Sequence, residues 1–231
     1  MLKTAIITGG TGAIGTALVK EFNKDFNIVF TYLESKSKAD MLSKKYGATG
    51  FCCDVSDRKS VEMVISECPN CELLINNAGI SQQKLFTDIT ELEWHKMINV
   101  HLTGAFNFSQ GVLPGMINRK CGCIINISSI WGVIGASCET HYSAAKAGLI
   151  GLTKALAKEV GPSGVRVNAI APGVIESEMN SCFSPEEMRQ ITDSVSLYRM
   201  GCPDDVSEAA RYLLGAEYVT GQVLNVDGGF Y

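Results

Sequence analysis

The stretch TAIITGGTGAIG, residues 4–15, decides the fold. A β-branched apolar run over 4–8 leads directly into a glycine cluster over 8–15, and a helical pattern begins at Ile14. Glycines at such a junction allow a tight turn and leave the first N–H groups of the helix free to face a pyrophosphate. No Lys-Ser or Lys-Thr pair follows Gly15, which argues against a triphosphate-binding loop. The stretch therefore predicts a βα unit that binds a phosphate-bearing ligand.

Alternating strands and helices extend outward from this unit along the whole chain. The strands are nearly continuous apolar runs, as expected when both faces of a parallel sheet are covered. This alternation predicts an α/β Rossmann fold with one doubly wound, seven-stranded parallel sheet and helices on both faces. Strands are expected at 4–8, 27–32, 49–54, 72–78, 123–128, 165–171 and 222–227, and helices at 14–24, 38–47, 58–67, 91–118, 142–160 and 204–214.

One interval, residues 173–203, interrupts the alternation. It contains Ser-Pro-Glu-Glu at 184–187, which places a capping serine before a helix, proline at the first helical position and glutamate at the third. A helix inserted after a strand, on the side where ligands bind, predicts a substrate lid over 173–203. No repeat, low-complexity segment or linker is present, so residues 1–231 are expected to form a single domain.

Composition and charge argue against several classes of protein. The net charge of −4 gives no reason to expect nucleic acid or an anionic membrane as a partner. The longest uncharged run, 121–138, is interrupted by asparagine, serine and glycine and is a poor membrane span. A strand-like run begins almost directly after Met1, so no secretory signal is expected and a cytoplasmic location is predicted.

The nine cysteines are expected to be reduced thiols used as small core residues. Cys68-Pro-Asn-Cys71 has the spacing of a redox motif, but it opens no thioredoxin-like helix. Neither this pair nor Cys121-Gly-Cys123 stands near a second cysteine pair or a histidine. We therefore predict no metal site.

Polar and small residues stand at the ends of consecutive expected strands. Asp54 ends the third strand, where a carboxylate can accept hydrogen bonds from an adenine amino group. Asn-Asn-Ala-Gly at 76–79 follows the fourth strand, where asparagine can satisfy backbone groups and Ala-Gly lets the chain pass close to a ligand. Each feature alone is more often a surface cap or a turn, but their joint occurrence predicts a binding edge.

Tyr142 and Lys146 lie one helical turn apart, with only small residues between them. An ammonium beside a phenol favours the phenolate, so Lys146 is expected to lower the pKa of Tyr142 and prepare it for acid–base chemistry. A chance pair on a surface helix is the alternative interpretation.

Together these motifs resemble the short-chain dehydrogenase/reductase family. The resemblance spans essentially all 231 residues, and it includes TGGTGAIG at 8–15, Asp54-Val55, NNAG at 76–79, NISS at 126–129, YSAAK at 142–146, Pro-Gly at 172–173 and the closing VDGG. Ala13 departs from the family pattern, which usually has glycine there. The departure should cost little if the φ of Ala13 is negative.

The resemblance implies an NAD(P)-dependent oxidoreductase with Ser129, Tyr142 and Lys146 as catalytic residues. Ser129 would hydrogen-bond the substrate oxygen, Tyr142 would donate the proton, and Lys146 would also bind the nicotinamide ribose. His101 stands where the family commonly has asparagine, and it is expected to hold a relay water while titrating near neutral pH, or else to be structural. The implied cofactor contacts are Thr8, Gly9, Thr11, Gly12, Ile14, Gly15, Tyr32, Asp54, Val55, Asn77, Ala78, Gly79, Tyr142, Lys146, Pro172, Gly173, Ile175 and Ser177, with no metal.

The loop after the second expected strand bears on the choice of nicotinamide. Enzymes that prefer NAD commonly carry an acidic residue just after this strand, but here the strand ends in Thr31 and Tyr32. Ser35, Lys36 and Lys38 can meet a 2′-phosphate, whereas Glu34 would repel one if it pointed inward. NADP(H) is therefore the expected cofactor, with NAD(H) as the alternative.

The resemblance also implies an assembly. Members of the family form tetramers, so a homotetramer is expected for this chain.

The resemblance leaves the substrate open. The pattern is closest to bacterial 3-oxoacyl-[acyl-carrier-protein] reductases, which implies a small or carrier-bound ketone. Arg119 and Lys120 are a possible contact for the carrier, although Ser163 replaces an arginine that these reductases often have. The alternatives are a reductase of the 5-aminopentanone on modified elongation factor P, an NAD-dependent secondary-alcohol dehydrogenase, and a non-catalytic nicotinamide-sensing regulator. The intact Ser129, Tyr142 and Lys146 argue against the regulator.

Overall fold

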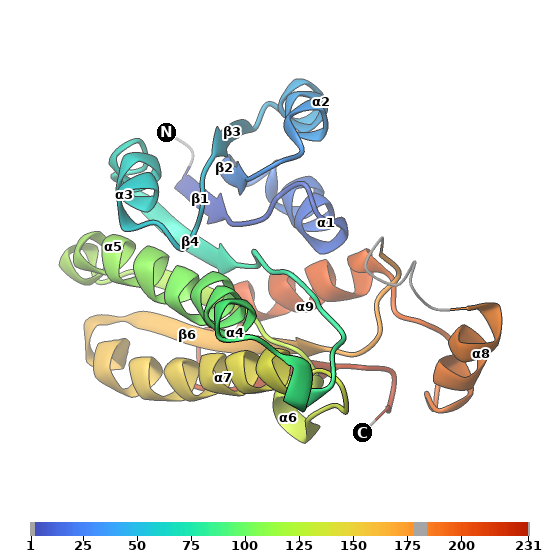
Figure 1. Cartoon of the computed structure of the whole chain (residues 1–231). Coiled ribbons are helices and arrows are strands. Elements are labelled where there is room, and N and C mark those ends of the chain that lie inside the picture. Colours follow the sequence, from blue (N-terminus) through green and yellow to red (C-terminus); the bar gives the residue numbers. More distant parts are fainter. Residues whose placement is uncertain (1–2, 178–183, 231) are drawn as a thin grey trace.

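A computed structural model describes residues 3–177 and 184–230 (Figure 1). Seven parallel strands form one sheet in the order β3-β2-β1-β4-β5-β6-β7. The chain moves outward in one direction from β1 to β3 and then in the other from β4 to β7, so the strand order reverses between β1 and β4. The strands are β1 (Lys3–Ile7), β2 (Phe26–Tyr32), β3 (Thr49–Cys52), β4 (Cys71–Asn76), β5 (Gly122–Ile127), β6 (Val165–Pro172) and β7 (Val223–Val226).

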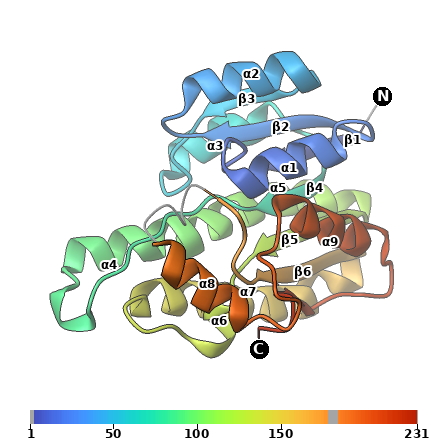
Figure 2. The same cartoon turned by 90° about the vertical axis from the view of Figure 1, so that its right-hand side faces the viewer.

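Helices cover both faces of the sheet, which confirms the predicted α/β Rossmann fold (Figure 2). On one face, α1, α2 and α9 bury apolar side chains against the sheet, and on the other face α3, α5 and α7 do so. The helices are α1 (Ala13–Phe22), α2 (Lys36–Tyr46), α3 (Arg58–Ser66), α4 (Glu91–Ile98), α5 (Gly104–Arg119), α6 (Trp131–Ile134), α7 (Thr140–Val160), α8 (Pro185–Asp193) and α9 (Pro203–Gly215), with short helices η1 (Phe86–Asp88), η2 (Asn99–Thr103) and η3 (Gly161–Ser163).

The long helix expected over 91–118 is divided in the structure. Its first part is α4 and its second part is α5, and the π-helical turn η2 joins them. A π-helical turn holds one residue more than an α-helical turn, so it changes which side chains of the following segment face inward. His101 lies in this turn and is buried.

The interval 173–203 contains the helix that its capping motif predicted. Ser184 Oγ accepts a hydrogen bond from the N–H of Glu187, and the Glu187 carboxylate accepts one from the N–H of Ser184, so both ends of the capping box are formed. Residues 178–183 of the expected lid lie outside the described residues. A bridge between Ile175 and Gly201 joins the start and the end of the interval.

The cysteines of the described chain are free thiols, but the prediction that they are core residues holds only in part, because Cys52 and Cys121 are exposed and Cys138 and Cys202 are half-buried. Cys68 and Cys71 lie in the hydrophobic core, where burial raises their pKa values to about 11 and about 12. Such thiols are weak nucleophiles, which agrees with a packing role. Within residues 3–177 and 184–230, no three His, Cys, Asp or Glu side chains are grouped to hold a metal ion, and no helix combines the length and apolar character that a membrane span needs.

Candidate active site

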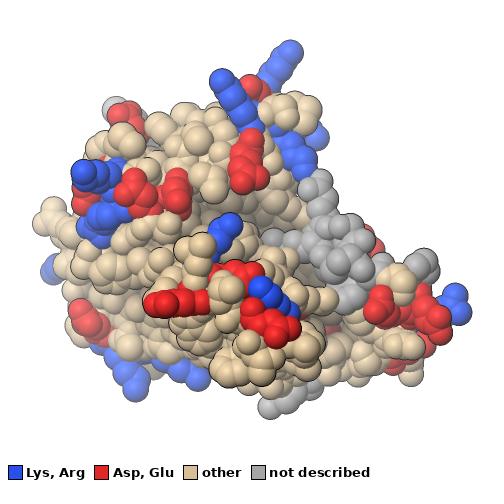
Figure 3. Space-filling view, viewed as in Figure 1, with Lys and Arg blue, Asp and Glu red and all other residues tan. Residues whose placement is uncertain are grey.

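A large pocket of about 1940 Å³ opens at the carboxyl edge of the sheet, where the strand order reverses. In open α/β sheets, ligands bind outside the carboxyl ends of the strands at such a reversal. The space-filling view shows a hollow in this face, with acidic and basic side chains next to one another on its lower rim (Figure 3). We refer to this pocket as the main pocket.

The glycine-rich loop forms one wall of the main pocket. Gly9 has φ +65°, and a Cβ there would lie 2.8 Å from the Cα of Ala78. A Cβ on Gly15 would lie 2.1 Å from the carbonyl oxygen of Gly9, so only glycine fits where α1 packs on the loop. Ala13 is the first residue of α1 and has negative φ, so its departure from the family pattern is tolerated, as predicted.

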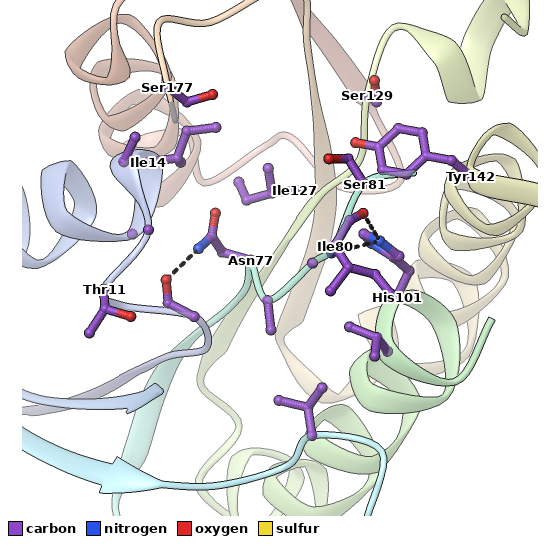
Figure 4. A pocket seen from close by; sticks show the side chains of 18 of the residues that line it. Thr11, Ile14, Asn77, Ile80, Ser81, His101, Ile127, Ser129, Tyr142 and Ser177 are labelled. Atoms are coloured by element: carbon purple, nitrogen blue, oxygen red, sulfur yellow. Dashed lines mark hydrogen bonds between the residues drawn. The ribbon is translucent and has the colours of Figure 1, made fainter. Parts of the chain in front are cut away.

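Two loops meet at Thr8. Its hydroxyl oxygen accepts hydrogen bonds from the N–H groups of Asn77 at 2.8 Å and Ala78 at 2.9 Å. In return, the Asn77 side-chain amide donates to the carbonyl oxygens of Thr8 and Gly9. Figure 4 shows Asn77 pointing toward the glycine-rich loop. Asn77 therefore ties the glycine-rich loop to the segment after β4.

The end of the main pocket beside β2 and α2 contains the residues expected to face the adenosine. Tyr32, Asp54 and Lys38 line it, but Lys36 does not. Glu34 also lines the pocket, which is the position from which it is expected to repel a 2′-phosphate. One oxygen of Asp54 accepts from the N–H and the hydroxyl of Ser56, at 2.9 and 2.7 Å. Helix α2 adds Lys45, which has the same orientation as Lys38 because seven residues make about two turns.

Ser129, Tyr142 and Lys146 come together where β5 ends beside α7. Ser129 is 7% exposed and lines the main pocket next to Tyr142 (Figure 4). The Lys146 ammonium donates to the carbonyl oxygen of Ile127 at 2.7 Å and lies 5.5 Å from the centre of the Tyr142 ring. The hydroxyl of Ser128 instead donates to the backbone carbonyl of Lys146, which agrees with the choice of Ser129 by spacing.

The comparison with known proteins agrees with this geometry. A family profile described as enoyl-(acyl carrier protein) reductase matches residues 10–231. The chain is 41% identical to Nodulation protein G of Azospirillum brasilense, over 98% of this chain and 97% of that protein. It is 35% identical to 3-oxoacyl-[acyl-carrier-protein] reductase FabG of Staphylococcus aureus, over 100% and 99%, and 35% identical to Uncharacterized oxidoreductase YmfI of Bacillus subtilis, over the full length of both.

The chain belongs to the short-chain dehydrogenase/reductase family. It is therefore an NAD(P)-dependent oxidoreductase that acts on CH–OH or keto groups. Two features of the main pocket fit such a dinucleotide. The N-terminus of α1 is open, because Gly12 makes no side-chain cap there, and Gly9 and Gly15 have no space for a side chain.

Burial moves the pKa values of Tyr142 and Lys146 away from their ordinary values. Burial raises the pKa of Tyr142 to about 12, and a hydrogen bond with Ser129 lowers it only in part. Burial also lowers the pKa of Lys146 to about 7. Burial therefore outweighs the lowering effects on the pKa of Tyr142, and the idea that Lys146 favours the phenolate stays a prediction.

His101 is buried and fixed. Its Nε2 lies 2.8 Å from the carbonyl oxygen and 3.1 Å from the nitrogen of Ile80, and its ring meets the Tyr142 ring edge-on, with centroids 5.1 Å apart (Figure 4). Burial, with the nearby charge of Lys146, holds the pKa of His101 well below its ordinary value. The prediction that this histidine titrates near neutral pH is therefore wrong, while its part in a proton relay stays a prediction.

We expect His101 to remain neutral when the pH falls through the ordinary histidine value of 6.5. The unfolded chain binds a proton at this residue below pH 6.5 and the folded chain does not, so the free energy of unfolding contributed by His101 falls as the pH is lowered. A ¹⁵N NMR titration of the ring nitrogens checks this expectation. A His101 signal that shifts with a midpoint at 6.5 or above would contradict the burial argument.

The segment after β6 forms another wall of the main pocket, with Ser177 near Ile14 (Figure 4). Pro172, Gly173, Ile175 and Ser177, which the resemblance implies as cofactor contacts, line the main pocket. A Cβ on Gly173 would lie 2.8 Å from the Cα of Asp227 in the closing VDGG motif, so this turn also needs glycine.

Sequence reasoning missed the wall that residues 80–83 and α4 form. The Gln82 amide nitrogen donates to Glu93 at 2.7 Å, and its amide oxygen accepts from Nε2 of His141 at 3.0 Å. Lys84 forms an ion pair with Glu93 at 2.8 Å. No motif marks these residues, because the wall depends on pairing between a loop and a helix. The missed lining residues are Ser81, Gln82, Gln83, Leu92, His95 and Lys96.

Arg119 and Lys120 do not lie at the main pocket. They end α5 just before β5, which is the opposite edge of the sheet. The Arg119 guanidinium donates to the carbonyl oxygens of Pro69 and Cys71. A carrier contact of this pair would lie away from the main pocket, and it stays a prediction.

Proposed function

We propose that the protein is an NADPH-dependent carbonyl reductase whose substrate is a 3-oxoacyl thioester. The observation that carries this proposal is the meeting of Ser129, Tyr142 and Lys146 in one pocket, with Tyr142 protonated at neutral pH. Tyr142 can donate a proton to a ketone oxygen, and the same group accepts a proton from an alcohol in the reverse reaction, so the arrangement serves both directions. The 35% identity to 3-oxoacyl-[acyl-carrier-protein] reductase FabG of Staphylococcus aureus supports the reductive direction over a secondary-alcohol dehydrogenase.

Each side chain has a defined part in the reaction. Reduced nicotinamide supplies the hydride when it is bound. Ser129 donates a hydrogen bond to the ketone oxygen, and Tyr142 transfers its phenolic proton to that oxygen as the new C–H bond forms at carbon. Lys146 then returns a proton to the phenolate, because a pKa of about 7 lets it gain and lose protons at physiological pH. The products are the alcohol and the oxidised cofactor.

The cofactor contacts proposed from the sequence all line the main pocket except Thr8, which supports the pocket from behind. Gly9, Gly12 and Gly15 would hold the pyrophosphate at the start of α1, and Asp54 and Val55 would face the adenine. Lys146 would hold the nicotinamide ribose, and Pro172 to Ser177 would face the carboxamide.

Lys38 and Lys45 support the preference for NADPH. Both line the adenosine end of the main pocket, and Ser35, which precedes α2, forms no side-chain cap there. We expect the double change Lys38→Ala with Lys45→Ala to raise KM for NADPH about tenfold or more while KM for NADH changes little, because only NADPH carries the 2′-phosphate.

Steady-state kinetics with both cofactors checks this expectation, and Lys44→Ala with Lys36→Ala is the matched control because neither residue lines the pocket. Equal losses with NADPH and NADH would contradict a phosphate contact.

A ketone that carries an amine is a second candidate substrate. Glu139 lines the main pocket close enough to Tyr142 to raise the pKa of its phenol. Burial raises the pKa of Glu139 as well, although a hydrogen bond from Gln83 lowers it in part. Among residues 3–177 and 184–230, no cationic side chain is paired with this carboxylate. This feature favours the 5-aminopentanone alternative, in which an ammonium would pair with Glu139.

The deciding experiment compares two substrates with wild-type enzyme. NADPH oxidation is followed with acetoacetyl thioester, free or on an acyl carrier protein, and with a short amino-ketone. Fast turnover of the thioester supports the main proposal, and preference for the amino-ketone supports the second. Tight NADPH binding without turnover of either substrate would overturn both proposed functions and favour the non-catalytic nicotinamide-sensing regulator.

The lid and the assembly also stay proposals. Ile191 of α8 lines the main pocket, which supports a lid role for the interval 173–203 in a single domain. Phe106 and Ile117 are apolar and exposed on α5, at 44% and 40%, which supports burial between subunits of a homotetramer. Light scattering measures that mass directly.

A further inference from the structure

A second, much smaller cavity of about 10 Å³ lies behind the active site. The first residue after β1, Thr8, lines it together with Asn76 at the end of β4 and His101 of η2. The rest of its lining is apolar or glycine. A cavity of this size is at the lower limit for one water molecule, provided that polar partners are present.

The histidine supplies one unused acceptor. Nε2 of His101 lies 2.8 Å from the carbonyl oxygen of Ile80 and 3.1 Å from its amide nitrogen, and we assign the hydrogen to Nε2 because the contact with the oxygen is the shorter one. Nδ1 is then a bare acceptor. It is buried and has no hydrogen-bond partner among the described residues.

Asn76 supplies the second unused acceptor. Its amide nitrogen donates to Asn126 at 2.8 Å and to Ser109 at 3.2 Å. Asn126 is itself oriented, because its own amide nitrogen donates to Thr153, whose hydroxyl donates to the carbonyl oxygen of Leu149. This chain fixes which end of the Asn76 amide is oxygen, and that oxygen is buried with no partner among residues 3–177 and 184–230.

Thr8 supplies the donor. Its hydroxyl oxygen already accepts from the N–H groups of Asn77 and Ala78. Within the part of the chain that the structure describes, no acceptor is paired with the hydrogen of this hydroxyl. Two acceptors and one donor therefore line a single cavity.

We propose that this cavity holds one ordered water, which accepts a hydrogen bond from Thr8 and donates to Nδ1 of His101 and Oδ1 of Asn76. Three hydrogen bonds are typical of a buried water, and this arrangement uses both of its hydrogens. The water joins the start of the glycine-rich loop to η2, and it holds the His101 ring edge-on to Tyr142. His101 is in this sense a positioning residue.

The test uses Ala105, which lines the small cavity and is buried. Ala105→Val fills the space and should expel the water, whereas Ala210→Val makes the same change in the buried face of α9 and is the control. A high-resolution crystal structure of the wild type should show a density peak within hydrogen-bond distance of the three atoms. The ¹⁵N signal of His101 Nδ1 should move toward that of an unbonded acceptor in Ala105→Val only.

Each outcome decides the proposal. A wild-type crystal structure with no peak at the site, or a peak that does not contact Nδ1 and Asn76, overturns it without any variant. Protonated Nδ1 in the NMR spectrum would overturn the assigned direction of the hydrogen bonds. Any loss of turnover in Ala105→Val rests on the proposed reductase function, but the density and the ¹⁵N signal do not, so the two proposals can fail separately.

Discussion

Replacing Tyr142 by phenylalanine is expected to lower kcat for ketone reduction by about 10²–10⁴-fold, the usual contribution of a positioned general acid. The phenol is the one proton donor that Ser129 and Lys146 flank in the described part of the main pocket. Phenylalanine keeps the ring, and with it the edge-on contact to His101. NADPH affinity and the free energy of unfolding should therefore stay close to the wild-type values.

Stopped-flow hydride transfer and fluorescence titration of NADPH measure the two effects separately. Tyr218→Phe removes a fully exposed phenol and is the matched control, which should behave as wild type. If Tyr142→Phe keeps most of the wild-type rate of hydride transfer, another group donates the proton and the mechanism is wrong. If it loses NADPH binding as well as turnover, the phenol acts in cofactor binding rather than in chemistry.

The fold could be predicted from the sequence because its signals are local. Apolar runs such as 123–128 are buried on both faces as β5, and the Ser184 capping motif begins α8 where expected. The turn η2 could not be predicted, because one residue inserted into a helix leaves the apolar pattern over 91–118 almost unchanged. The extra residue in this turn determines the direction in which His101 faces the main pocket.

In the candidate site, too, the features set by local sequence could be predicted and those set by tertiary packing could not. The spacing of Tyr142 and Lys146 predicted that their side chains lie close together, because residues four apart are neighbours on one face of a helix. Spacing carries no information on burial, which depends on how α7 packs against β5 and β6, and burial is what sets both pKa values. The wall formed by Gln82 and Glu93 stayed hidden for a related reason, since it depends on a contact between a loop and a helix.

Lys146→Met is expected to separate stability from activity. Lys146 is 4% exposed, and its ammonium has a backbone carbonyl, that of Ile127, as its hydrogen-bond partner. Methionine fills a similar volume without a charge, and replacing buried charges by apolar side chains of similar size often stabilises a protein by about 1–4 kcal/mol. Turnover should fall by about 10²-fold or more, because the group that returns the proton to Tyr142 is lost.

The shifted pKa of Lys146 also makes the free energy of unfolding depend on pH. The pKa of Lys146 is about 7 in the folded chain and 10.5 as the ordinary value, so between these pH values the unfolded chain binds more protons. The wild-type free energy of unfolding should therefore rise with pH over this window. Tyr142 acts oppositely between pH 10 and about 12, where the folded chain holds the proton and stability falls as pH rises.

Urea unfolding at a series of pH values checks the expectation. In Lys146→Met the rise between pH 7 and 10 should become shallower, and the gain over wild type should be largest at and below pH 7. Lys154→Met changes an exposed lysine two turns further along α7 and should leave the profile unchanged. A Lys146→Met protein that is less stable than wild type at pH 7 would mean that Lys146 stabilises the fold, and that its burial does not set its pKa.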